Sequence, residues 1–184
     1  MKTKLTFLAL LACFLMHAQY HDGTVFLKDS TELKGLIKVR PLGGIKFKSN
    51  RDDKPTAYDY NHITGFHTKG ENYIYIKTSI DFPPRIVKEH ITGKITLYST
   101  EIYNPGHTIP AGYAGGGMTM GGGSATIYFL MVENKITRLG PKLKKKHFLF
   151  FKSCPILIDK INSKEIHRRE VYDIVDFYNK KCPS

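Results

Sequence analysis

Residues 153–182 read SCPILIDKINSKEIHRREVYDIVDFYNKKC and carry a cysteine near each end, Cys154 and Cys182. Apolar side chains recur there at i, i+3, i+4 and i+7, the stripe of an amphipathic helix: Val171, Ile174, Val175 and Tyr178. A shorter helical segment is expected before it, at Pro155–Ile161. The chain is therefore predicted to close with helices that pack one face onto a core.

The boundaries of the last helix follow from its polar residues. Asn162 is expected to cap it, because Glu165 follows three residues later as in a capping box. Pro183 lies beyond the last turn, where a helix would end. The face opposite the apolar stripe is predicted to carry charged side chains: Arg168, Arg169, Asp173 and Asp176.

The beginning of the chain has the layout of a secretory signal peptide. Lys2 and Lys4 give a cationic start, an apolar run extends from Leu5 to Met16, and Ala18 offers a small residue for cleavage. The run is shorter than the about 20 residues that a membrane-spanning helix needs. We therefore expect residues 1–18 to be a signal peptide, and the mature protein to be periplasmic, envelope-associated or secreted, without a transmembrane anchor.

Lipidation at Cys13 is the alternative for this segment. Leu10–Cys13 resembles a lipoprotein box, which would leave Cys13 as a lipid-bearing N-terminal residue. The apolar run continues through Phe14–Met16 after the cysteine, where a lipoprotein usually turns polar. Cleavage after Ala18 is therefore favoured.

Export bears directly on the remaining cysteines. Loss of Cys13 with the signal leaves Cys154 and Cys182, and a cysteine pair in an oxidising compartment favours a disulfide over two free, buried thiols. Closing a loop of this length stabilises a fold by about 3 to 4 kcal/mol in the chain-entropy account. The bridge would tie the end of the last helix to the start of the preceding helical segment.

Before the tail, the hydrophobic pattern changes to that of short strands. The polar turn DSTE separates two apolar stretches, 24–28 and 33–39, and predicts a hairpin. Ile45 and Phe47 are expected to point inward, since lysines alternate with them. Further strands are expected at 72–77 (NYIYIK), at 94–97, where Ile95 and Leu97 alternate with Lys94 and Thr96, and at 125–132 (ATIYFLMV). The last run has no polar face and is expected to lie centrally in the sheet.

These patterns together predict an α+β fold, an antiparallel β meander or partly open barrel covered by two or three C-terminal helices. The mature chain, 19–184, is expected to be a single domain in which the sheet and the tail share one core. Its parts are a β meander at 19–102, a Gly-rich flexible loop at 103–124, strands at 125–139 and a helical tail at 142–184.

The loop, YNPGHTIPAGYAGGGMTMGGGS, is expected to lack regular strand or helix because glycine and proline dominate it. A lid or docking arm is one interpretation and a plain flexible loop is the other. Phosphate binding is disfavoured because the glycines are not followed by G-K-[ST].

Charge is the clearest indication of function. The chain has 28 lysines and arginines against 16 acidic residues, a formal net charge of +12. Such a balance favours acidic partners, which outside the cytoplasm are lipid head groups, anionic polysaccharide or an envelope protein. The alternative is a solvated basic face that serves solubility. The densest predicted anion-binding patch, beside His147, is Lys142, Lys144, Lys145 and Lys146, joined by Arg168 and Arg169 if the helices pack side by side.

Nucleic acid is disfavoured as a partner. Binding of single strands favours exposed aromatic side chains among the basic ones. Phe148, Phe150 and Phe151 follow the lysines but are expected in the core.

Catalytic motifs are not found in the sequence. None of the eight histidines stands in a recognisable metal-ligand spacing, and no G-x-S-x-G turn surrounds a serine, so no catalytic residue, metal or cofactor is predicted. The expected function is a non-enzymatic binding or structural module of the envelope. The alternative is a secreted hydrolase with a dispersed site built from His62, His90 and His107.

Several stretches resemble small uncharacterised exported proteins of Gram-negative, Bacteroidota-type bacteria. The stretches are GTVFLKDSTELKGLIKV, IKFKS, YDYNHITGF, GKITLY and SCPILIDKI…VYDIVDFYNKKC. In that group a G-x-[VIL]-x-L-x-[DN]-[GS] hairpin opens a β-rich body, and a Y-N-x-x-C end closes a Cys-paired helix. The resemblance implies export and the cysteine pair, and adds no catalytic residue. Ser30 stands where glycine is expected after Asp29, which leaves the turn type open.

Overall fold

The computed structural model describes residues 20–40, 43–78, 81–104, 107–109, 118–120 and 122–183, with side chains for all but 104, 107–109 and 118–120. The predicted signal peptide, its cleavage site and Cys13 lie outside the described residues. The strands are β1 (His21–Leu27), β2 (Glu32–Val39), β3 (Ile45–Lys48), β4 (Thr56–Tyr58), β5 (Ile63–Thr68), β6 (Glu71–Ile76), β7 (Arg85–Ile91), β8 (Thr96–Asn104), β9 (His107–Ile109), β10 (Met118–Met120), β11 (Gly123–Val132) and β12 (Lys135–Gly140). The helices are the 3₁₀ helix η1 (Lys145–Phe151), α2 (Pro155–Asn162) and α3 (Val171–Lys181).

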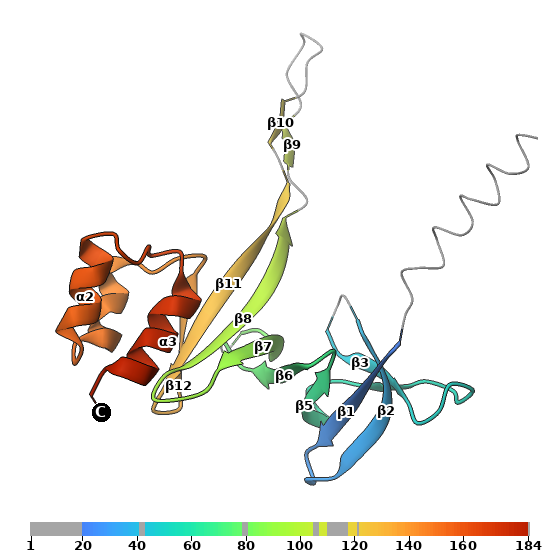
Figure 1. Cartoon of the computed structure of the whole chain (residues 1–184). Helices are drawn as coiled ribbons and strands as arrows, with labels where there is room; N and C mark the ends of the chain where they lie inside the picture. The colour runs from blue at the N-terminus through green and yellow to red at the C-terminus, as the bar shows by residue number, and fades with distance from the viewer. Residues whose placement is uncertain are drawn as a thin grey trace, which may run out of the picture. The chain divides into compact units, whose positions relative to one another are not determined.

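Ten of these strands form an open antiparallel sheet in the order β12-β11-β8-β7-β6-β5-β1-β2-β3-β4. The helices follow near the C-terminus (Figure 1). The predicted α+β class is confirmed, in its open meander form. β11 is an interior strand, but only second from one end of the order, so its expected central place is wrong.

The chain divides into two compact units: unit 1 is Met1–Tyr75 with Pro84–Ile86, and unit 2 is Ile76–Pro83 with Val87–Ser184. Most of the buried apolar side chains of the described residues gather in two clusters, one in each unit. The strands of unit 1 therefore bury a cluster of their own. The helical tail does share the cluster of unit 2 with strands.

In unit 1, the β1–β2 hairpin forms as predicted, with Val25 opposite Leu33. Its turn is closed by the side chain of Asp29, whose Oδ1 accepts a hydrogen bond of 2.9 Å from the N–H of Thr31. Ser30 takes the left-handed conformation, φ 70°, that glycine adopts most readily. The hairpin thus tolerates serine at the position where the resemblance leads one to expect glycine.

The buried cluster of unit 1 confirms the predicted alternation in β3. Ile45 and Phe47 are buried, whereas Lys46 between them is exposed. The other members come from β1, β2 and β5: Val25, Ile37, Ile63 and Phe66. Phe66 stacks on Tyr73 of β6 with ring centroids 4.9 Å apart.

Regular structure extends into the stretch 103–124 that was expected to have none. β8 continues to Asn104, β11 begins at Gly123, and β9 pairs antiparallel with β10, with Thr108 opposite Thr119. The prediction is wrong for these residues because antiparallel pairing satisfies the backbone, and β-branched residues such as Ile109 favour the extended chain. The rest of the stretch lies outside the described residues.

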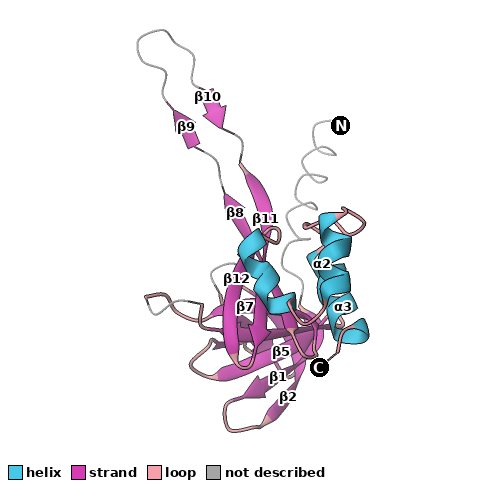
Figure 2. Cartoon of the chain, turned by 90° about the vertical axis from the view of Figure 1, so that its left-hand side faces the viewer, coloured by secondary structure: helices cyan, strands magenta, loops and turns pink. Residues whose placement is uncertain are grey.

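In unit 2 the helices pack on one side of β8, β11 and β12 (Figure 2). The strands contribute Leu97, Leu130 and Leu139, together with Ile95 just before β8. The predicted stripe of α3 is buried: Val171, Ile174, Val175 and Tyr178. Phe151 of η1 and Leu157 and Ile161 of α2 are buried with it. Thr96 is also buried, so the alternation expected around it fails where both faces of β8 are covered.

The predicted helix cap is wrong. Asn162 is the last residue of α2 rather than the cap of α3, because the N–H groups of Ser163 and Ile166 still bond to carbonyls of that helix. Turns follow, and α3 begins after Glu170. The carboxylate of Glu165 accepts a hydrogen bond from the ammonium of Lys160 instead of capping.

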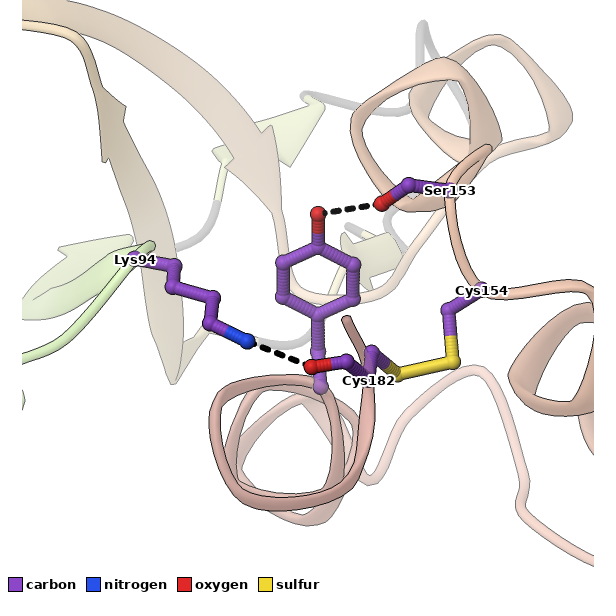
Figure 3. The surroundings of a disulfide bond; sticks show 5 residues. Lys94, Ser153, Cys154 and Cys182 are labelled. Atoms are coloured by element: carbon purple, nitrogen blue, oxygen red, sulfur yellow. Dashed lines mark hydrogen bonds between the residues drawn. A yellow bond between two sulfur atoms is a disulfide. The ribbon is translucent and has the colours of Figure 1, made fainter. Parts of the chain in front are cut away.

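Cys154 and Cys182 form the expected disulfide, with Cα atoms 5.4 Å apart. Cys154 directly precedes α2 and Cys182 directly follows α3, so the bridge joins the two helix ends that the sequence indicated. The ammonium of Lys94 donates to the carbonyl of Cys182, and the hydroxyls of Ser153 and Tyr178 share a hydrogen bond of 2.8 Å (Figure 3). Cys182 is thus held to α2 through the disulfide and to the segment before β8 through Lys94.

Candidate anion-binding site

A hollow of about 900 Å³ opens in unit 2 where three segments meet. One segment leads into η1, the second is the C-terminal end of α2, and the third is the turn before α3. The lining residues are Lys142, Leu143, Lys144, Lys145, Ile161, Asn162, Lys164, His167, Arg168, Arg169 and Glu170. We refer to this feature as the basic hollow.

The basic hollow brings together five of the six residues of the predicted patch: Lys142, Lys144, Lys145, Arg168 and Arg169. Lys146 is exposed but does not line it. Lys164 and His167 line it and were missed. They belong to the run KEIHRR, whose basic density was visible in the sequence, but the run was assigned to a helix rather than to a turn.

Leu143 explains why the two basic segments lie side by side. Its side chain is buried in the cluster of unit 2, while Lys142 and Lys144 on either side of it are exposed. Its N–H donates a hydrogen bond of 2.8 Å to the carbonyl of Arg168. One buried residue therefore fixes the lysines of the first segment next to the arginines of the third.

Arg168 is the most constrained cation of the basic hollow. It is half-buried, and its guanidinium carbon lies 5.2 Å from the centroid of the Phe148 ring. A cation held over an aromatic face has fewer rotamers available than a lysine in water. Arg168 is thus partly positioned before any ligand arrives.

The charge of the basic hollow is strongly one-sided. Six lysines and arginines line it, and Glu170 is the one carboxylate in the lining. That carboxylate accepts a hydrogen bond of 2.8 Å from the N–H of His167, which engages it in the turn before α3. Clustered cations in a concave site focus the field and attract anions.

His147 adds no charge to the patch in which it was placed. It is buried, at 2% exposure, and its Nδ1 accepts a hydrogen bond of 3.1 Å from the N–H of Lys144. Burial, and then the charges of Lys146 and Lys144, hold the pKa of His147 below its ordinary value. The ring therefore acts as a neutral structural group at the start of η1.

Two of the three histidines of the alternative hydrolase site, His62 and His90, contact side chains of their own units. Nδ1 of His62, in unit 1, lies 2.8 Å from a carboxylate oxygen of Asp59. Nε2 of His90, in unit 2, lies 2.7 Å from Oγ of Ser99, which is buried at 6% exposure. The side chain of His107 is outside the described residues. Among the residues that are described, no group of three or more His, Cys, Asp and Glu is placed to hold a metal ion.

Within the described ranges, no helix is long and apolar enough to cross a membrane. Comparison of the chain with protein-family models, with curated proteins and with solved structures gave no match. The resemblance to exported Bacteroidota-type proteins therefore stays a prediction.

Proposed function

We propose that this protein is a non-enzymatic binding module that acts outside the cytoplasm and holds an anionic component of the cell envelope in its basic hollow. The observation that carries the proposal is the convergence of six lysines and arginines from two segments of the chain around one concave site. A solvated basic face would not need its charges gathered in this way. The hydrolase alternative has no comparable cluster among the described residues in its support.

The proposed location is supported by two independent features. The sequence predicts a signal peptide at residues 1–18. Cys154 and Cys182 are bridged, and disulfides persist mainly in oxidising compartments. An anionic lipid or polysaccharide is favoured over an acidic protein because four of the six cations are lysines, which bind flexibly as point charges.

Binding to vesicles tests this function. The mature protein is titrated with vesicles of phosphatidylglycerol and phosphatidylcholine, with vesicles of phosphatidylcholine alone, and with dextran sulfate. Each titration is repeated from about 0.05 M to about 0.5 M NaCl, since exposed charges are screened over this range. We expect binding to the anionic vesicles or polymer only, and a steep loss of affinity with salt.

The matched variants share the same change in net charge. The double substitution Lys142→Glu and Arg169→Glu reverses two charges of the basic hollow. Lys34→Glu with Lys135→Glu reverses two exposed lysines elsewhere and is the control. Binding should be lost in the first variant and largely kept in the second. Equal losses in both, or binding that ignores salt, would contradict the proposal.

A further inference from the structure

We infer that the basic hollow takes a compact head group that carries two or more phosphates on a sugar-sized ring, rather than the flat surface of a charged bilayer. This inference rests on the proposed function and names the chemical class of its ligand. It follows from the number of cations, the size of the site and the way its walls are held.

The number of cations argues for a ligand with several charges. Lys142, Lys144 and Lys145 come from one segment, and Lys164, Arg168 and Arg169 from the segment between α2 and α3. One monovalent anion would leave most of these charges facing one another. Two or more phosphates on one body can meet both segments at once, and each accepts several charge-assisted hydrogen bonds.

The size of the site argues for a body larger than one phosphate. About 900 Å³ lies within the range of pockets that hold whole small molecules, about 300 to 1,000 Å³. The lining also includes the exposed amide of Asn162, which can donate to and accept from a sugar hydroxyl. A flat membrane surface would reach the rim of the basic hollow and leave this amide unused.

The walls of the site are held in place by contacts that do not involve a ligand. The disulfide closes a loop that contains the lining residues from Ile161 to Glu170. The N–H of Leu143 donates a hydrogen bond to the carbonyl of Arg168, and the guanidinium of Arg168 packs on the ring of Phe148. A site whose backbone and one of whose cations, Arg168, are positioned in advance loses less entropy on binding, which suits a defined ligand better than a variable surface.

The test compares one ring with different numbers of phosphates, free and on a lipid. Calorimetry measures the affinity of the mature protein for inositol 1,4,5-trisphosphate and for inositol 1-phosphate. Vesicles of phosphatidylcholine with phosphatidylinositol 4,5-bisphosphate are compared with phosphatidylglycerol vesicles of equal net charge. We expect the trisphosphate to bind at least about tenfold more tightly than the monophosphate, and the bisphosphate vesicles more tightly than the phosphatidylglycerol vesicles.

The two sources of the head group are separated by the same data. Tighter binding of the free trisphosphate points to a soluble phosphorylated ligand. Tighter binding of the vesicle-borne bisphosphate points to a phosphorylated glycolipid. Both outcomes support the inferred class.

Variants test whether the basic hollow is the site. Lys164→Gln and Arg168→Gln each remove one charge from the lining, and Lys146→Gln removes one charge nearby but outside it. The first two should weaken trisphosphate binding by about tenfold, and the third by less than about twofold. An equal loss in all three would overturn the inference, because binding would then follow overall charge.

The failures of the two proposals are distinguishable. If the trisphosphate and the monophosphate bind alike while phosphatidylglycerol vesicles are still bound through the basic hollow, the ligand class is wrong and the proposed function stands. If neither ring compound nor any anionic vesicle or polymer binds, both are wrong.

Discussion

His147 shows how one buried side chain couples the stability of unit 2 to pH. Its pKa in the folded protein is lowered by burial and by two neighbouring lysines. As pH falls below about 6.5, the unfolded chain takes up a proton that the folded chain resists. The contribution of the neutral ring to the free energy of unfolding is therefore complete above about pH 6.5. It is lost as the pH falls from there to the lower pKa of the folded protein.

We expect the free energy of unfolding of the wild type to fall more between about pH 7 and about pH 5 than that of a His147→Gln variant. The difference between the two proteins is the informative quantity, because the contributions of all other titrating groups cancel in it. Urea unfolding at each pH measures it. Identical pH slopes in the two proteins would show that His147 titrates alike in the folded and unfolded states.

Elements with a clear hydrophobic period, or with a polar turn between two apolar stretches, could be predicted, whereas short strands and helix ends could not. The stripe of α3 and the β1–β2 hairpin follow from spacing and from the polar turn DSTE. β9 and β10 are three residues long and are stabilised by pairing with each other, so the local composition did not predict them. Asn162 resembled a cap because the end of α2 and the start of α3 have similar polar chemistry.

The disulfide should stabilise both the helices and the basic hollow. Replacing Cys154 and Cys182 by serine should lower the free energy of unfolding by about 3 to 4 kcal/mol, since the closed loop no longer restricts the unfolded chain. Affinity for anionic vesicles should fall as well, because the loop carries the lining from Ile161 to Glu170. Urea unfolding and the vesicle assay measure the two effects.

Reduced wild-type protein is the matched control for this double variant. It should lose the same stability and affinity without any substitution. Unchanged binding in both forms would mean that the remaining contacts, such as the one between Leu143 and Arg168, hold the site by themselves.

Across the whole molecule, most of the basic site was predictable, because lysines crowded in sequence stay close in space. Whether Arg168 and Arg169 join the lysines depended on how the tail folds. The hydrogen bond from the N–H of the buried Leu143 to the carbonyl of Arg168 brings them together. Lys164 and His167 could not be assigned to the basic hollow from the sequence, because no local pattern predicted the turn between α2 and α3. The division into two units was also hidden, since each strand shows which residues are buried but not with which partners they cluster.

Because each unit has its own buried cluster, we expect the two units to lose protection from hydrogen exchange separately. The disulfide lies in unit 2, so its reduction should speed hydrogen exchange there before it affects unit 1. Hydrogen exchange of the intact mature protein, with and without reductant, is read by mass spectrometry of peptides. Peptides from α2, α3 and β11 should lose protection on reduction, whereas peptides from β1, β2 and β5 should keep it. A uniform loss across both sets would show that the two clusters unfold as one cooperative body, and that the division seen in the packing has no counterpart in stability.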